Sequence, residues 1–335
     1  MKNYARTELH LHLDGSMTVR FAYEQSLKQG IIDKDCSFRD YYNLVFRDNA
    51  QPHRVSINKF DLMCDILQDA ESLHLAAYDL AKRLSELGLW YAEIRFASQQ
   101  HLKHGLTQLE ALQAVIGGAE AGMRDYPGIR IGIIDCLMHK GDSAAFNQKE
   151  NEASIEAVRE MLHKGAVGID LAGYENNCSF SDYGPLIREA KKSGIPCTVH
   201  AGEMGIASHI LDALSWGVER IGHGVNCVND EAILKEVVNS RIPLEVCVTS
   251  NVKRDMNYGN HAVLELLEKG ADVTLNSDNM MFARTNAANE HFQLKMLGVS
   301  DKTLRQCTEN AIRAAFCGET ARKELLAKLN EEELS

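Results

Sequence analysis

Eight short apolar segments alternate with helical patterns along this chain of 335 residues, and this alternation predicts an α/β fold, a (β/α)8 TIM barrel. Strands that are joined by helices pair in parallel, and eight parallel strands close a barrel. The length is ordinary for such a barrel with insertions. The predicted strands are Thr7–Leu13, Trp90–Phe96, Ile129–Leu137, Val167–Leu171, Pro196–His200, Arg220–His223, Pro243–Val248 and Asp272–Asn276.

Helical patterns fill the gaps between these strands, and a glycine often closes the helix just before the next strand, as is typical of a helix C-terminus. The predicted helices are Ala76–Leu87, Leu106–Met123, Asn151–Lys164, Tyr183–Ser193, Ile206–Trp216, Ala232–Ser240 and Ala262–Lys269. The glycines that fit the closing role are Gly88, Gly165, Gly194, Gly217 and Gly270.

The first connection, from Gly15 to Gly88, is unusually long. It predicts extra helices inserted after the first strand, lying over one barrel end as a lid. The tail from Lys302 to Ser335 predicts closing helices that end in solvated acids. We therefore expect residues 1–335 to form a single TIM-barrel domain.

The bulk composition excludes several classes of partner. The formal net charge of −11 gives an acidic surface that repels phosphate backbones, so no nucleic-acid partner is expected. The nine cysteines are scattered without a CxxC pair, which is typical of reduced thiols in a cytoplasmic protein. The first residues lack the layout of a signal peptide, and no apolar stretch is long enough to span a bilayer, so no membrane partner is expected. No feature predicts a particular oligomeric state.

Four side chains of the kinds that bind metals lie where predicted strands end, which is where a TIM barrel carries its functional groups. His10 and His12 close the first strand, His200 closes the fifth, and Asp278 follows the eighth. Residues two apart on a strand project to the same side, so both imidazoles of the first pair can reach one ion. Taken alone, this pair also fits two histidines that are satisfied by hydrogen bonds. Three histidines and one aspartate at one mouth favour a divalent ion such as zinc, with a position left for water.

Two further titratable residues follow strands at the same mouth. Glu203 comes three residues after His200, in the place for a general acid or base beside a metal-bound water. It also fits the first turn of a helix, where acids are favoured. His223 stands between two glycines that let the backbone approach the centre, so it could orient an attacking hydroxide. Its alternative is a buried histidine bonded to a carbonyl group.

Several motifs together resemble the adenosine deaminase family. They run in that family's order and cover the chain from residue 7 to residue 279. The motifs are TELHLHLDGS (7–16), KFD (59–61), EIRF (93–96), DLAG (170–173), HAGE (200–203), RIGHG (220–224), LEVC (244–247) and LNSDN (275–279).

The resemblance implies a zinc-dependent hydrolytic deaminase that converts adenosine, and 2′-deoxyadenosine, to inosine and ammonia. Protonation of purine N1 makes C6 electrophilic, and zinc makes hydroxide available near neutral pH. The resemblance implies that Glu203 passes the proton to N1 and that His223 holds the attacking hydroxide, with Asp278 completing the catalytic group. The implied ligands of one zinc ion per chain are His10, His12, His200 and Asp278.

The resemblance also implies how a small-molecule purine nucleoside is bound. Gly173 would offer its backbone N–H to purine N3, and Asp14 would accept the ribose 5′-hydroxyl. The helix around Phe60, Leu62 and Ile66 would form the apolar lid, although its spacing alone indicates a buried amphipathic face. The implied substrate-binding residues are His12, Asp14, Gly173 and Asn279.

Asn279 departs from the family pattern, which often has a second aspartate there for purine N7. An asparagine amide always carries donor hydrogens, so it can serve the N7 acceptor without taking up a proton. It also fits a residue that caps the turn after the eighth strand. Related adenine deaminases tend to carry glutamate in place of Asp14, and the shorter acid leaves room for a sugar hydroxyl.

Three alternatives stay open at this point. The first is a deaminase of free adenine or of another aminopurine nucleoside. The second is a non-catalytic binding protein that kept the barrel as a scaffold, although such a protein should have lost the ligand set or Glu203. The third is a metal-dependent hydrolase of esters or amides; such sites commonly bridge two metals, and no strand ends in a lysine suited to that role.

Overall fold

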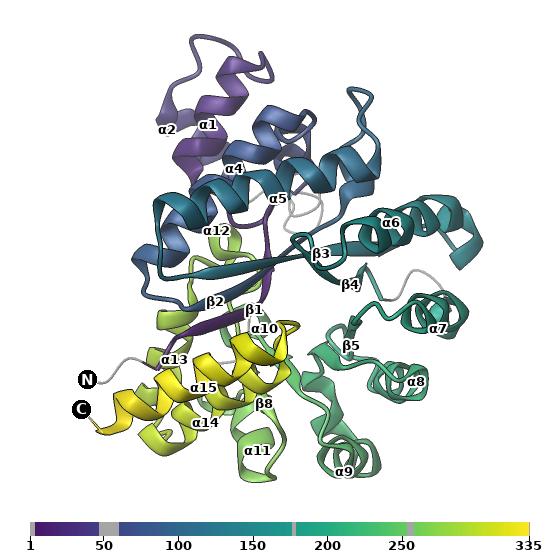
Figure 1. Ribbon diagram of the computed structural model, residues 1–335, viewed down its shortest axis with the longest axis vertical. Helices are drawn as coiled ribbons and strands as arrows, with labels where there is room; N and C mark the ends of the chain where they lie inside the picture. The colour runs from purple at the N-terminus through teal and green to yellow at the C-terminus, as the bar shows by residue number, and fades with distance from the viewer. Residues whose placement is uncertain (1–3, 47–59, 176–178, 253–257, 335) are drawn as a thin grey trace.

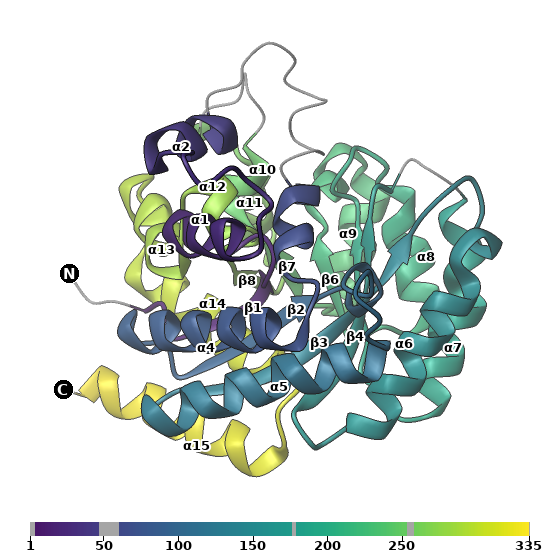
Figure 2. The same ribbon diagram turned by 90° about the horizontal axis from the view of Figure 1, so that it is seen from above.

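Eight parallel strands lie at the centre of the computed structural model, within its described residues 4–46, 60–175, 179–252 and 258–334. Helices surround the strands in both views (Figures 1 and 2). The strands pair in chain order as two sets of four, β1 to β4 and β5 to β8. Their bounds are β1 Thr7–His12, β2 Tyr91–Phe96, β3 Arg130–His139, β4 Ala166–Gly173, β5 Thr198–Ala201, β6 Arg220–His223, β7 Leu244–Val246 and β8 Val273–Leu275.

Backbone contacts close the two sets into a barrel. Ile169 of β4 donates its N–H to the carbonyl of Pro196, just before β5, over 3.0 Å. On the other side, His12 donates to the carbonyl of Asp278 over 3.0 Å, and Asp278 donates to that of His10 over 2.9 Å. The (β/α)8 fold class predicted from the sequence is therefore confirmed, and the chain beyond β8 is joined directly to the end of β1.

Helices follow the strands as the sequence predicts. Those of the repeating pattern are α5 Gln108–Asp125, α6 Gln148–Met161, α7 Gly184–Lys192, α8 Ser208–Trp216, α9 Glu231–Ser240 and α11 Ala262–Glu268. The five glycines expected to close helices all adopt positive φ, between 75° and 111°. Four-residue helices at the mouth are α10 Val248–Asn251 and α12 Met280–Ala283, and the chain ends with α13 Ala287–Met296, α14 Asp301–Ala314 and α15 Glu319–Leu334.

The long first connection holds extra helices, as expected. They are α1 Val19–Lys28, α2 Phe38–Phe46, a helix described over residues 60–66, and α4 Ala70–Glu86. The face of the 60–66 helix predicted to be apolar is buried at Met63 and Ile66. Lys59, the first residue of the KFD motif, lies outside the described residues. Among the described helices, none is long and apolar enough to cross a membrane.

The predicted strand Pro243–Val248 runs into a helix. The sequence suggests a strand through Val248, but β7 ends at Val246 and Val248 begins α10. The side chain of Asn251 accepts a hydrogen bond from the backbone N–H of Cys247 over 3.3 Å, which turns the chain away from the sheet. The side chains that follow β7 are thereby brought over the mouth of the barrel.

The interior of the barrel holds a network of charged side chains, each fully buried. Arg95 of β2 donates to Asp170 of β4 and to Glu245 of β7, both over 2.9 Å. Arg220 of β6 donates to the other oxygen of Glu245 over 2.6 Å and also pairs with Glu93 of β2. Each charge is compensated inside the network, which links four strands directly beneath the mouth.

Candidate active site

The four side chains expected to bind a metal meet at the carboxyl end of the barrel. The Nε2 atoms of His10 and His12 lie 3.8 and 3.5 Å from Oδ1 of Asp278. The ring centre of His200 is 4.5 Å from that of His10 and 5.4 Å from that of His12. Strands β1 and β5 and the residues after β8 therefore bring these groups to one point, as the spacing of the sequence predicts.

Buried carboxylates hold two of these histidines by their Nδ1 atoms. His10 Nδ1 lies 2.8 Å from Glu245, and His200 Nδ1 lies 2.9 Å from Asp170. Such a contact fixes the ring and leaves Nε2 as the nitrogen that faces the site. His10 Nε2 is buried and has no hydrogen-bond partner. Burial, together with the nearby Arg95, holds the pKa of His10 well below its usual range, so its ring is neutral and suited to bind a cation.

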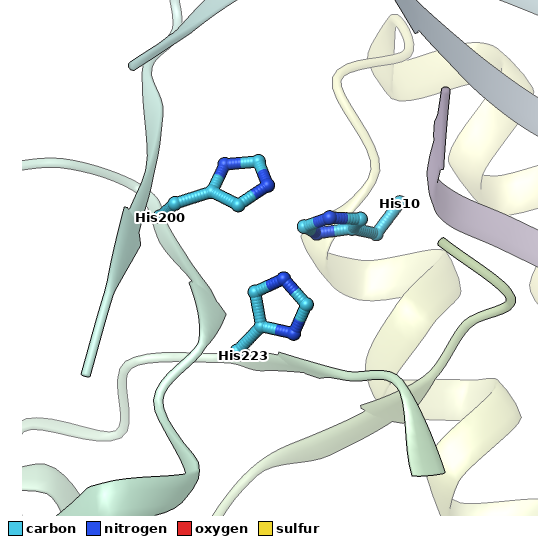
Figure 3. A group of neighbouring side chains, drawn as sticks. All are labelled: His10, His200 and His223. Atoms are coloured by element: carbon cyan, nitrogen blue, oxygen red, sulfur yellow. The ribbon is translucent and has the colours of Figure 1, made fainter. Parts of the chain in front are cut away.

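His223 joins the same group from the end of β6. Figure 3 shows the rings of His10, His200 and His223 pointing toward one another. The side-chain amide of Asn251 lies 3.0 Å from His223 Nδ1, and Oε2 of Glu203 lies 3.7 Å from Nε2. Two overlapping three-residue sets are therefore close enough to hold an ion. They are His10 with His200 and His223, and His10 with His12 and Asp278.

Two residues of the site have an unusual backbone. His223 and Asp278 both have a φ of 60°, in the left-handed region that residues with a side chain rarely adopt. Ser250 donates to Oδ2 of Asp278 over 2.5 Å. Burial raises the pKa of this carboxyl, but the facing histidines and the Ser250 hydrogen bond outweigh burial, so its pKa is lowered. A conformation of this kind persists only where the surroundings hold it, and it is common at functional sites.

A cavity of about 440 Å³ opens beside these histidines. Its wall includes Glu203, whose side chain is 25% exposed, and Asp14, which is buried so completely that its pKa rises to about 7. Gly173 also lines it, with a φ of 117°, and a Cβ there would lie 2.9 Å from the carbonyl oxygen of His139. This position therefore requires glycine, whose bare backbone faces the cavity. Phe60 lies at the wall, where a lid was expected.

Asn279 lies in the cavity wall between the expected metal site and the end of β1. Its Nδ2 donates to Oδ1 of Asp278 over 2.7 Å, and its Oδ1 is buried without a hydrogen-bond partner. A Cβ on Gly15 would lie only 1.6 Å from that oxygen, so the amide is packed against the bare glycine backbone. Although Asn279 precedes α12, its side chain makes no capping hydrogen bond.

Residues 5–332 match the family described as adenosine deaminase. The chain belongs to the adenosine deaminase family. An adenosine deaminase of Haemophilus ducreyi is 31% identical, over 99% of this chain and 97% of that protein. One from Clostridium kluyveri is 32% identical, over 100% and 95%. The crystal structure of adenine deaminase from Arthrobacter aurescens matches with a TM-score of 0.85 at 24% identity, over 98% of this chain and 99% of that one.

Membership confirms the resemblance found in the sequence and makes this adenosine deaminase family member a hydrolytic deaminase. Several residues of its site carried no predicted role. Arg95 and Glu245 stood in the EIRF and LEVC motifs, and a signal was present, because a charged residue within an apolar strand of a barrel demands a buried partner. Glu175, two residues beyond the DLAG motif, had no such signal.

Proposed function

We propose that this protein is a zinc-dependent hydrolytic deaminase of adenosine, and of 2′-deoxyadenosine, that releases inosine and ammonia. One observation carries the proposal: His10 Nε2 is buried, unpartnered and aimed at the point where His12, His200 and Asp278 converge. An unpaired polar atom at such a depth is costly unless a ligand occupies it. Three imidazoles and one carboxylate suit zinc, which we assign as one ion per chain.

The residues around this point fit the steps of a hydrolytic deamination at purine C6. Zinc, held by the four ligands, would lower the pKa of a bound water to near neutrality and so supply hydroxide. Glu203, which faces the cavity, gives a proton to purine N1, and C6 thereby becomes electrophilic. His223 orients the attacking oxygen by a hydrogen bond, and its contact with Asn251 holds the ring in place. The amino group then takes up the proton of the attacking oxygen, and expulsion of ammonia from the tetrahedral carbon gives the 6-oxo purine.

The substrate is held by groups on two sides of the cavity. The N–H of Gly173 reaches purine N3, and the amide of Asn279 reaches N7. Asp14 accepts the ribose 5′-hydroxyl, with His12 beside it. Buried as it is, Asp14 makes a site for a neutral hydroxyl group rather than for a bulkier anion.

The charge of the cavity favours a nucleoside over a nucleotide. Apart from Asp278, which is assigned to the metal, the acidic residues in its wall are Asp14, Asp61 and Glu203. These acidic groups would repel a phosphate group at close range. An uncharged ribose meets no such repulsion, so we assign adenosine rather than its monophosphate as the substrate.

The test is the ultraviolet change on mixing the protein with adenosine, together with ammonia release measured in parallel from four compounds. Adenosine and 2′-deoxyadenosine should react, whereas adenine and adenosine monophosphate should react far more slowly. A higher kcat/KM for adenine than for adenosine would overturn the nucleoside assignment. A higher value for the monophosphate would overturn the argument from charge.

A further inference from the structure

The turn that carries Glu203 is held by a buried carboxylate that lies just beyond the neighbouring strand β4. Three successive backbone N–H groups, those of Gly202, Glu203 and Met204, donate to the two oxygens of Glu175 over 2.7, 2.9 and 2.7 Å. Glu175 is only 1% exposed. Successive N–H groups that converge on one anion form a nest, which requires a left-handed residue among them. Gly202 supplies it with a φ of 70°.

The carbonyl groups of the same turn are held from the opposite side. The side-chain amide of Asn226, which follows β6, donates to the carbonyl oxygens of Gly202 and Glu203, both over 2.8 Å. Asn229 in turn donates to the amide oxygen of Asn226 over 3.0 Å, which fixes the orientation of the amide. The backbone of Glu203 is thus bound by an acceptor on one side and a donor on the other.

The side chain of Glu203, by contrast, lines the cavity. Its Oε2 lies 3.7 Å from Nε2 of His223, which is longer than a hydrogen bond. We propose that Glu175 and Asn226 are positioning residues, which clamp the peptide units of Glu203 so that its carboxylate swings only about its own side-chain bonds and meets purine N1. This inference rests on the proposed function, in which Glu203 moves the proton.

Glu175 is well placed to set the spacing of two contacts with the base. It lies two residues beyond Gly173, the residue assigned to N3, and it binds the turn assigned to N1. Only one ring atom separates N1 from N3, so both contacts must reach the same edge of the purine. A small shift of either strand end would spoil the pair, and misplacement by about 1 Å can cost a reaction about 100-fold.

The carboxylate of Glu175 is itself held in place by neighbouring side chains. His209 of α8 lies 3.2 Å from Glu175 through Nδ1, and its ring stacks on Phe180 at a centroid distance of 4.3 Å. Phe180 stacks in turn on Trp216 at 4.9 Å. Burial raises the pKa of Glu175, but the hydrogen bonds from His209 and the backbone lower it further, so the carboxyl is held below its ordinary pKa and stays ionised.

The experiment is a double-mutant cycle between Glu175→Gln and Glu203→Gln in the full-length, zinc-loaded protein. Glutamine keeps the shape of Glu175 but loses the charge and turns one acceptor into a donor that faces the N–H groups. We expect kcat of Glu175→Gln to fall about 10- to 100-fold, with KM changed less than about 3-fold and zinc content unchanged. In the Glu203→Gln background, measured in single turnovers, the same change should cost less than about 2-fold.

Glu219→Gln is the matched control. Glu219 also accepts a hydrogen bond from a backbone N–H beside β5, that of Cys197 over 2.8 Å, but it does so at the opposite end of the barrel. It should leave kcat unchanged. Asn226→Asp, which replaces the donor by an acceptor, should repeat the effect of Glu175→Gln on kcat and supplies the test if Glu175→Gln does not fold.

The outcomes separate this inference from the proposed function. Three outcomes would overturn the inference while leaving the function intact. They are an equal loss of rate from Glu175→Gln in both backgrounds, a change in KM alone, and an unchanged kcat in both Glu175→Gln and Asn226→Asp. An unchanged rate in Glu203→Gln itself would instead remove the role of Glu203 from the proposed function.

Discussion

Charged groups in the interior of the barrel and at its mouth are arranged differently. In the interior, Arg95 and Arg220 bind carboxylates on both sides, so every charge is compensated by a neighbour. At the mouth, His10 Nε2 is buried without a hydrogen-bond partner and faces the site, and Glu203 faces a cavity. Compensated charges hold strands together, whereas an unpartnered atom that faces a site costs stability and marks where a ligand is expected.

The two regions are joined rather than independent. Glu245 and Asp170 belong to the interior network, and the same carboxylates bind the Nδ1 atoms of His10 and His200. The interior therefore orients the rings whose opposite nitrogens face the mouth. From this comparison we expect changes at the mouth to affect catalysis most and changes among the satisfied interior groups to affect stability.

The largest effect should follow removal of the metal. Dialysis against a chelator should abolish ammonia release from adenosine, since the converging histidines would have no cation to bind and no activated water would form. Elemental analysis should find about one zinc per chain before dialysis, and added zinc should restore the rate. Full turnover by protein shown to be metal-free would remove zinc from the mechanism.

A matched pair of variants decides which histidines bind the metal. The two overlapping sets share His10; one adds His200 and His223, and the other adds His12 and Asp278. We expect His12→Ala to lose zinc and His223→Ala to keep it, because Asn251 already binds Nδ1 of His223 and we assign its Nε2 to the attacking oxygen. The reverse result would assign the ion to the set of three histidines that are drawn in Figure 3.

The second largest effect is expected at Glu203. Glu203→Gln should keep about one zinc per chain and lose roughly 10²- to 10⁴-fold in kcat, the usual contribution of a general acid–base group. Steady-state kinetics with adenosine and elemental analysis of the same sample measure both quantities. If the rate is unchanged, Glu203 serves only the turn after β5.

The sequence predicts the fold and the meeting of the site residues for a simple physical reason. Alternating strand and helix patterns give parallel strands, and the carboxyl ends of parallel strands in a barrel share one face. Polar residues near the carboxyl end of such a strand, as His10 and His200 are, or just beyond it, as Asp278 is, therefore lie near one another. Their chemical roles do not follow from this placement, and they remain proposals.

The contacts of Glu175 and Asn226 with the Glu203 turn, and the interior network, could not be predicted in the same way. They depend on which side chains face each other across strands. The carboxylate of Glu175 reaches a turn 27 residues away, and Arg95 binds Glu245 from 150 residues away. No spacing in the sequence encodes such a pair. The early end of β7 is a further case, since the hydrogen bond from the N–H of Cys247 to the side chain of Asn251 cannot be inferred from the apolar character of Val248.

A smaller effect is expected at Asn279, whose amide has one hydrogen engaged by Asp278 and one left for the cavity. If that hydrogen meets purine N7, 7-deazaadenosine, which lacks the acceptor, should lose about 1–3 kcal/mol in kcat/KM relative to adenosine. Asn279→Ala should narrow the gap between the two substrates. Equal kcat/KM values for both compounds in the wild-type protein would show that Asn279 does not contact N7.

The smallest effect is expected from a buried group of the interior whose hydrogen bonds are made, Asp135 of β3. Its carboxyl is fully buried and accepts hydrogen bonds from the N–H and the hydroxyl of Ser98 over 2.9 and 2.6 Å. Burial raises its pKa to about 7, although these hydrogen bonds lower it. In the unfolded chain an aspartate has a pKa of about 3.9. Between about pH 4 and pH 7 the folded protein therefore keeps a proton that the unfolded chain has lost.

Since the folded state binds more protons in that range, Asp135 makes the free energy of unfolding fall as the pH rises, by at most about 1.4 kcal/mol per pH unit. Asp135→Asn cannot titrate, so its stability should fall less steeply than that of the wild type between pH 5 and pH 7. Urea unfolding at several pH values measures the two slopes, while kcat with adenosine should stay within about 2-fold because Asp135 lies outside the assigned site. Parallel stability profiles would show that Asp135 is ionised in the folded protein. A large loss of kcat would show that a change at a hydrogen-bonded group of the interior also affects catalysis at the mouth, which would contradict the comparison.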